Sequence, residues 1–280
     1  MTQDAIVIVA ARRTPIGAFQ GALSPVSAPE LSAIASKACL SDCGIQAADI
    51  SEALFGCVLS AGLGQAPARQ AVLAAGVPDA VPTTTINKVC GSGMKAVHIG
   101  ADMIRAGNAA IVLAGGMESM SNAPYLLPKA RSGYRMGHQE VLDHMFYDGL
   151  QNPYDGQMMG IFGDATAKTY GFSRTEQDEF AIESVQRALA TAAAGTFAAE
   201  LAPVTVRDRK GETLITSDEE PGRCDLKRIP TMRPAFAKDG TVTAATSSSI
   251  SDGAASLLLM SEAEAQRRGL KPLARIIGQA

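Results

Sequence analysis

The sequence of 280 residues lacks tryptophan and is poor in the other aromatic residues, with eight Phe and five Tyr. Stacking on nucleic-acid bases would therefore have few side chains to use. Lys and Arg number 25 against 28 Asp and Glu, so the basic excess typical of nucleic-acid-binding domains is also missing. These shortages exclude a generic nucleic-acid-binding protein, although a local basic patch for a small anion is still allowed.

Histidine and long apolar runs are scarce as well. The sequence has three histidines, His98, His138 and His144, and no pair of cysteines has C-x-x-C spacing, which argues against a Cys/His metal site. No apolar run approaches the roughly 18–20 residues that a membrane helix needs. The sequence therefore predicts neither a metal site nor a membrane-spanning segment.

The five cysteines are odd in number and scattered along the chain. This pattern argues against a disulfide framework and indicates a reducing compartment. The first ten residues, MTQDAIVIVA, have no basic segment ahead of their apolar stretch, so they do not resemble a secretory signal. We therefore expect a cytoplasmic protein.

Strand and helix patterns alternate along the first 120 residues, and a hydrophobic content of 46% is enough for a sizeable core. The apolar run at 6–9 is typical of a strand buried on both faces, and Pro29 begins a helix that Gly44 ends. Further strands are expected at 53–59, 83–88 and 110–114, and helices at 67–75 and 91–106. The alternation predicts an α/β fold with parallel strand pairs covered by helices.

The pattern changes at about Met117. From there to Phe172 the chain is rich in Met, Gly, Pro, Tyr and His and shows no long periodic segment, which is typical of a functional or assembly loop. A capping box at 173–176 then predicts a helix, and strand patterns return at 256–260 and 273–277. We read Asp252 and Gly253 as a turn before the first of these strands. The simplest interpretation is one α/β domain interrupted by a long excursion.

The sharpest chemical feature is Cys90, which stands where the β-branched run at 83–86 gives way to a predicted helix. A thiol at a helix N-terminus lies near unpaired N–H groups and the positive end of the helix dipole, both of which favour the nucleophilic thiolate. The same N–H groups could stabilise an oxyanion. Local sequence leaves two readings open at this point, a nucleophile or a small buried cysteine in a tight turn.

A series of motifs around and beyond Cys90 resembles the thiolase superfamily, and within it the acetyl-CoA acetyltransferases and 3-ketoacyl-CoA thiolases. The motifs follow in family order over essentially the whole chain, and their joint occurrence is very specific. They include NKVCGSG at 87–93 and GGMESM at 115–120, with further matches at 11–17, 64–70, 158–160, 173–178, 233–236, 240–244 and 251–255.

The resemblance implies a thiolase-like layered α/β fold with one mixed sheet covered by helices. Residues 1–120 with 248–280 would form the N-terminal α/β domain, and 121–247 a loop domain that binds coenzyme A and carries a tetramerisation loop near 124–142. It further implies acyl-CoA substrates, no covalently bound cofactor, and a homo-oligomer, either a dimer or a tetramer.

The resemblance also implies roles for individual residues. Cys90 would be the nucleophile that takes the acyl group as a thioester. The residues that match substrate-binding and CoA-binding positions are Leu150, Met158, Met159, Arg223, Ala244 and Ser248. Relatives often have His where this sequence has Met158, and the spacing around Arg223 differs by about one residue. The basic residues at 223–238 fit either a CoA-phosphate site or an ordinary solvated face.

The sequence departs from the family in one large respect: it contains no counterpart of the second α/β half. The Asn-Glu-Ala-Phe segment, the Gly-His-Pro histidine and the second catalytic cysteine of thiolases do not occur in it. General acid–base groups typically contribute about 10²–10⁴-fold each. We therefore expect the 280 residues alone to be poorly active. The alternative is a truncated, non-catalytic CoA-binding or assembly module.

The missing half also bears on packing. The helix at 91–106 would lose its cover and expose an apolar stripe of Val97, Ala101 and Ile104, and exposed apolar surface of this kind marks an interface. We expect the chain to pair with itself or with a separate C-terminal thiolase half, unless it is a cut piece of a complete enzyme. His98 is expected to be a packing residue, and His138 and His144 surface or interface groups.

Overall fold

The computed structural model describes residues 4–209 and 211–280, so the first three residues of the segment tested for a secretory signal lie outside the described part. The chain divides into two compact units. Unit 1 comprises Met1–Asn122, Glu200–Ser217 and Ser251–Ala280, and unit 2 comprises Ala123–Ala199 and Asp218–Ile250. None of the described helices has both the length and the apolar character needed to cross a membrane.

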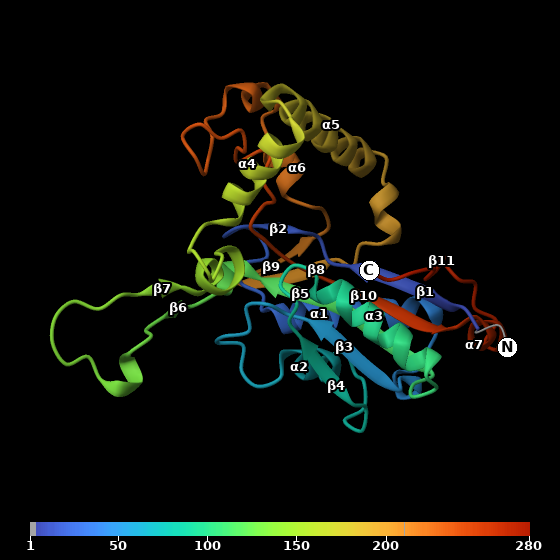
Figure 1. Ribbon diagram of the computed structural model, residues 1–280. Helices are drawn as coiled ribbons and strands as arrows, with labels where there is room; N and C mark the ends of the chain where they lie inside the picture. The colour runs from blue at the N-terminus through green and yellow to red at the C-terminus, as the bar shows by residue number, and fades with distance from the viewer. Residues whose placement is uncertain (1–3, 210) are drawn as a thin grey trace. The chain divides into compact units, whose positions relative to one another are not determined.

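Unit 1 is built on a seven-stranded sheet with the order β11-β1-β10-β5-β3-β4, and β2 pairs with β10 (Figure 1). Strand β3 is parallel to β4 and β5, whereas β10 is antiparallel to β5 and β1. The predicted mixed sheet is therefore confirmed. Its strands are β1 (Ile6–Arg13), β2 (Gly17–Ala18), β3 (Glu52–Gly56), β4 (Thr83–Ile86), β5 (Ile111–Ser119), β10 (Ser251–Ser261) and β11 (Ala274–Arg275).

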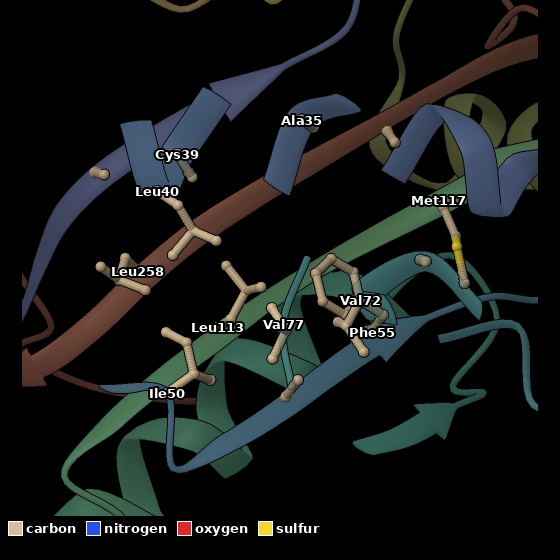
Figure 2. Close-up of a cluster of buried hydrophobic side chains, with 14 of the residues drawn as sticks. Ala35, Cys39, Leu40, Ile50, Phe55, Val72, Val77, Leu113, Met117 and Leu258 are labelled. Carbon is tan, nitrogen blue, oxygen red and sulfur yellow. The ribbon is translucent and has the colours of Figure 1, made fainter. Parts of the chain in front are cut away.

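Helices cover both faces of this sheet (Figure 1). Successive residues of a strand point to opposite faces, so Leu54 packs in one cluster and Phe55 in the other. Figure 2 shows the cluster that contains Phe55, Leu113 and Leu258 with residues from α1 and α2. The cluster of Leu54 contains residues of α3. The helices of this unit are α1 (Ala28–Cys43), α2 (Pro67–Ala74), α3 (Ser92–Arg105) and α7 (Glu262–Arg267).

Local sequence explains where α1 begins and ends. Ser27 caps its N-terminus by accepting a hydrogen bond from the amide of Glu30, whose side chain in turn accepts one from the Ser27 amide. Gly44 ends the helix in the left-handed conformation, with φ of 64°. The predicted helix from Pro29 to Gly44 is thus confirmed. The short 3₁₀ segments of unit 1 are η1 (Ala47–Asp49) and η2 (Met120–Asn122).

Two strands are longer than predicted because glycines that suggested their ends lie inside them. Strand β5 continues through Gly115 to Ser119, and a Cβ on Gly115 would overlap the carbonyl oxygen of Ala255 in β10. The predicted turn at Asp252 and Gly253 is wrong. Asp252 is fully buried in β10, where its carboxylate accepts a hydrogen bond of 2.9 Å from the amide of Ser121.

The prediction of an exposed apolar stripe on α3 is also wrong. Ala101 and Ile104 are buried in the cluster between α3 and the sheet, and Val97 is partly buried against it. The C-terminal segment adds cover, because Ile276 packs on the same cluster and the Gln279 side chain donates to the His98 carbonyl. His98 is half-buried, in line with the packing role expected for it.

The boundaries of the two units differ from those implied by the family resemblance at residues 200–217. The amide of Arg13 donates to the Glu200 carbonyl at 2.9 Å, and the amide of Ala202 donates to the Arg13 carbonyl at 2.7 Å. The hairpin of β8 (Val204–Asp208) and β9 (Gly211–Ile215) follows, with Val204 and Val206 buried in the core of unit 1. Hydrogen bonds and packing therefore attach this segment to the sheet domain.

Unit 2 contains more helix than its sequence predicted. Helix α5 (Arg174–Ala193) begins at the predicted capping box of Ser173 and Glu176. Helix α4 (Met159–Tyr170) was not predicted, because two glycines interrupt its apolar pattern. The remaining elements are β6 (Tyr125–Leu126), β7 (Leu142–Asp143), α6 (Glu220–Arg223), the π-helix η4 (Met145–Leu150) and the 3₁₀ segments η3 (Ala130–Ser132), η5 (Thr196–Ala199) and η6 (Leu226–Thr231).

The end of β3 provides a test of the packing between α3 and the sheet. A Cβ on Gly56 would lie 2.5 Å from the backbone nitrogen of Gly93 and from the carbonyl carbon of Ser92. We expect Gly56→Ala to lower the free energy of unfolding by about 1–3 kcal/mol, because backbone cannot yield as a flexible side chain can. Urea unfolding followed by circular dichroism measures this loss.

The matched control is Gly278→Ala, since a Cβ there meets nothing within 4 Å. We expect a change within about 0.5 kcal/mol for this exposed position. Equal stability of the two variants would contradict the packing described for Gly56.

Candidate active site

Cys90 lies in a turn between β4 and α3, at the edge of the sheet where the parallel strands end. Strand β4 ends at Ile86, and α3 begins at Ser92 with Gly91 as its N-cap. Ligand sites of α/β sheets form outside the carboxyl ends of the parallel strands. Of the five cysteines, all of which are described, Cys90 is the one classed as exposed. The alternative reading of a small buried cysteine is therefore wrong.

The turn before Cys90 has an unusual backbone. Val89 has φ of 48°, in the left-handed region that a β-branched residue rarely adopts. Its amide donates to Asn87 Oδ1 at 2.9 Å, and its carbonyl accepts from the amide of Ser92 at 3.0 Å. Such a conformation persists only where the surroundings hold it, and it occurs often at functional sites.

Glycines bring the first turn of α3 close to the strands beneath it. A Cβ on Gly116 would lie 3.2 Å from the Cα of Gly93, and Gly56 approaches Ser92 and Gly93 still more closely. Gly56 and Gly116 are register partners in β3 and β5. Gly93 therefore serves the contact between helix and sheet.

Glu118 orders the loop that follows β3 at the same edge of the sheet. Its carboxylate accepts hydrogen bonds of 2.9 Å from the amides of both Val58 and Leu59. This residue lies in the GGMESM segment, and its role was not predicted. The signal that could have indicated it is a charged side chain at the end of a buried apolar strand, where a carboxylate needs hydrogen-bond donors.

The other cysteines are poor nucleophiles. Burial, with the Glu118 carboxylate as a further cause, raises the pKa of Cys57 to about 12. Burial likewise raises the pKa of Cys39 to about 12. Desolvation also raises the pKa of Cys43 and of Cys224. Cys39 and Cys43, four residues apart on α1, are both free thiols.

Unit 2 holds two adjoining grooves lined by α5 and by the segment 244–249. The first, of about 330 Å³, is lined by Arg223, Arg228, Ala244 and other residues, and the second, of about 660 Å³, by Ser248 among others. Ser184, Val185, Ala245 and Ser247 line both. The structure thus brings together three of the predicted CoA-binding residues, which are Arg223, Ala244 and Ser248.

The charges in the smaller groove include both signs. Arg223 and Arg228 form no ion pair with any described residue, whereas Glu220 and Asp225 also line the groove. Two unpaired guanidinium groups can each bind a phosphate through several N–H donors. The groove can therefore bind an anion at its arginines.

The segment 244–249 is shaped by its own hydroxyl groups. Thr246 Oγ1 accepts from the amide of Thr243 at 2.8 Å, and Ser247 Oγ donates to the Thr243 carbonyl at 2.6 Å. Ser248 is exposed and, within the described residues, its hydroxyl is bonded to no other group of the chain. Among these three consecutive hydroxyl residues, Ser248 is thus the one free to bind a ligand.

Asp164 of α4 fixes the start of the same loop. Its Oδ1 accepts from the amide of Thr241 at 2.7 Å and from the amide of Val242 at 2.8 Å. A Cβ on Gly240 would overlap this carboxylate. The segment 240–244, which contributed to the family resemblance, therefore attaches the groove loop to α4 through Asp164.

The other predicted binding residues lie elsewhere in unit 2 and line neither groove. Leu150 is the last residue of the π-helix, Met158 is the N-cap of α4, and Met159 is its first residue. Gln151 pairs with Met158 in an isolated bridge, which brings Leu150 close to Met158 along the backbone. The roles of Leu150 and Met158 in the CoA channel and of Met159 in the acyl pocket stay predictions.

The contact between His144 and Asp148 was not predicted from the sequence. It is buried, with 5% of its surface exposed, and its Nδ1 lies 2.6 Å from Asp148 Oδ2. The sequence predicted a surface or interface group; the surface reading is wrong for His144, which is buried and pairs with Asp148 four residues later. His138, in contrast, is exposed.

The accessibility and pKa differences among the cysteines predict the order of their alkylation. At pH 8 a thiol with a pKa of about 12 has a thiolate fraction on the order of 10⁻⁴, so Cys39 and Cys57 will not react in the folded protein. We expect iodoacetamide to modify Cys90 first, as measured by peptide mapping with mass spectrometry. Labelling of Cys39 or Cys57 at the rate of Cys90 would contradict this order. In urea-unfolded protein the difference in rate between the cysteines should disappear.

Comparison with known proteins gives the family. The thiolase N-terminal domain family matches residues 6–263. An acetyl-CoA acetyltransferase of Pseudomonas aeruginosa is 48% identical over 277 residues, which cover 98% of this chain and 70% of the relative. One from Chromobacterium violaceum is 50% identical over 277 residues, covering 98% and 71%, and one from Saccharomyces cerevisiae is 46% identical over 283 residues, covering 99% and 71%. The chain belongs to the thiolase family.

Proposed function

We propose that the chain acts as an acetyl-CoA C-acyltransferase of the thiolase type, with Cys90 as the residue that accepts the acyl group. The observation that carries the proposal is an exposed thiol at the start of α3, at the carboxyl edge of the parallel strands. Relatives that are named acetyl-CoA acetyltransferases match nearly the whole chain. The alternative of a non-catalytic module is not favoured.

The first half-reaction is a transfer of the acyl group from sulfur to sulfur. The Cys90 thiolate attacks the thioester carbonyl of an acyl-CoA, and a new carbon–sulfur bond forms as the carbonyl oxygen becomes an oxyanion. The Ser92 amide already donates to the Val89 carbonyl, whereas the amides that follow it in the first turn of α3 have no acceptor within the helix and could stabilise this charge. The bond to CoA then breaks, CoA leaves as a thiolate that takes up a proton, and no electrons are exchanged with a cofactor.

The second half-reaction regenerates Cys90. The carbanion of acetyl-CoA attacks the acyl-enzyme in the condensation direction, and the same steps run in reverse in thiolysis. For residues 1–280 we propose the formation of the acyl-enzyme at Cys90 as their part in the reaction.

The grooves of unit 2 support a role in binding coenzyme A. Its nucleotide end carries phosphates that need cations, and Arg223 and Arg228 line one groove without a partner among the described residues. Its pantetheine arm is long and partly apolar, and it needs a lined channel with a few polar groups. Ser248 offers a free hydroxyl, and Ala244 lines the groove next to the arginines.

An exposed arm in unit 2 supports assembly with further copies of the chain. Every residue from 127 to 141 is exposed. Apolar side chains are among them, with 92% of Met136 and 56% of Val141 accessible to solvent. Exposed apolar surface of this kind marks an interaction site. We propose a homo-oligomer held in part by this arm, and a separate C-terminal thiolase half as a further partner.

Labelling tests the role of Cys90. We expect radiolabelled acetyl-CoA to leave its acetyl group on the peptide that contains Cys90, and Cys90→Ser to reduce the label to background. Cys43→Ser is the matched control, because its thiol is half-buried, its pKa is raised and it lines neither groove. Digestion and peptide mapping locate the label.

Wild-type protein with no label on Cys90 would favour the non-catalytic module instead. Formation of acetoacetyl-CoA at enzyme-like rates would contradict the expectation that proton-transfer residues beyond these 280 are needed.

Substitution of Arg223 tests the CoA groove. We expect Arg223→Ala to raise the Kd for CoA about tenfold, because charge-assisted hydrogen bonds contribute about 1.5–3 kcal/mol. Pantetheine, which lacks the phosphates, should bind equally to both proteins. Arg207→Ala removes the same charge from an exposed ion pair with Glu212 and should leave the Kd unchanged. Isothermal titration calorimetry at two salt concentrations measures these values, and equal weakening for CoA and pantetheine would exclude a phosphate contact.

A further inference from the structure

We propose that Ser92 is a positioning residue for Cys90, acting through the backbone turn that precedes the thiol. The inference rests on the proposed function of Cys90 and deepens it. Ser92 begins α3 and is buried, with 3% of its surface exposed. Its side chain bonds the residues before Cys90. Ser92 is therefore assigned a contact with the turn and no contact with the reacting atoms.

The hydroxyl of Ser92 holds two consecutive residues at once. Its Oγ accepts a hydrogen bond of 2.7 Å from the amide of Lys88 and donates one of 2.6 Å to the carbonyl of Val89. Both of its hydrogen-bonding functions are therefore committed to the turn. A buried hydroxyl in this arrangement has no proton to give to a substrate, which excludes Ser92 as an alternative nucleophile.

The turn needs this clamp because its conformation is strained. Val89 has φ of 48°, and its side chain is 48% exposed, so side-chain packing does little to hold it. A non-glycine residue held in the left-handed region costs about 1–3 kcal/mol and persists only when contacts over-determine it. Those contacts are the hydrogen bonds from Ser92 and the bond from the Val89 amide to Asn87 Oδ1.

Ser92 can act as a clamp because it is itself fixed to the sheet. A Cβ on Gly56 would lie 2.6 Å from the Cβ of Ser92, so the end of β3 and the start of α3 are in close contact. Packing against the sheet thus fixes Ser92, and the hydrogen bond from Ser92 fixes Val89. Cys90 follows Val89 directly, so the same contacts position its thiol.

Two readouts separate positioning from a purely structural role. We expect Ser92→Ala to lower the rate of Cys90 acetylation by acetyl-CoA about tenfold, because removing a buried hydrogen-bonding group shifts the turn away from its competent conformation. We also expect the pH profile of Cys90 alkylation by iodoacetamide to differ from that of the wild type, because the displaced thiol no longer lies at the start of α3.

The matched control is Ser32→Ala in α1. Ser32 is fully buried like Ser92, but its hydroxyl has no partner among the described residues. This variant should keep both the acetylation rate and the pH profile of the wild type. Urea unfolding of both variants shows whether they are folded under the assay conditions.

A double mutant tests the proposed route through Val89. Glycine adopts positive φ without strain, so a turn with Val89→Gly depends less on the clamp. Ser92→Ala should therefore cost less than about threefold in acetylation in the Val89→Gly background, against about tenfold in the wild type. Equal costs in both backgrounds would contradict this route.

If Ser92→Ala does not fold, Asn87→Ala provides the same test, because Asn87 is exposed and bonds the amide of Val89. A folded Ser92→Ala protein with unchanged acetylation and an unchanged pH profile would overturn the inference. Failure of the wild-type protein to acetylate at Cys90 would instead reject the proposed function, while the alkylation profile would still decide whether Ser92 positions the thiol.

Discussion

The contact between the first turn of α3 and the edge of the sheet is the constraint on which the candidate site depends. It is made almost without side chains, since Gly56, Gly93 and Gly116 approach one another where β3 and β5 run in register. Backbone in contact with backbone cannot repack around a larger residue. The thiol of Cys90 is thus held at a place set by the sheet itself, through a turn whose strained residue is bonded on both sides.

The two units contribute different chemistry. Unit 1 supplies the proposed nucleophile, Cys90, and a rigid support, with a core on each face of its sheet. Unit 2 supplies grooves with unpaired arginines and a free serine hydroxyl, which suit a ligand that is anionic at one end and mixed in polarity along its length. Because the grooves and the strained turn belong to different units, the residues of the grooves can change without altering the turn.

Much of the fold could be predicted from the sequence, because its signals are local. The proline at 29 and the glycine at 44 indicated the ends of α1 correctly, and the capping box at Ser173 indicated the start of α5. The errors arose where tertiary contacts override such signals. Gly115 lies inside β5, where the neighbouring strand leaves no room for a side chain, and Asp252 lies inside β10, where the Ser121 amide donates to its Oδ1.

The site was predictable in part for the same reason. A cysteine between a β-branched run and a helix is visible in the sequence, whereas the positive φ of Val89 and the two hydrogen bonds of Ser92 arise only from the folded turn. Arg223, Ala244 and Ser248 were identified by resemblance, and the structure adds that Ser248 keeps its hydroxyl free while its neighbours do not.

The clamp of Asp164 on the groove loop has a consequence for how sequences of this family are interpreted. Gly240 has no side chain because the carboxylate occupies that space, and the next two amides are tied to the same group. Asp164 therefore fixes the backbone of this segment, and the identity of its residues is restricted by packing and hydrogen bonding even if they contact no ligand. A search for residues that contact the ligand is therefore better directed at the lining of the grooves than at the most recognisable residues of the motif.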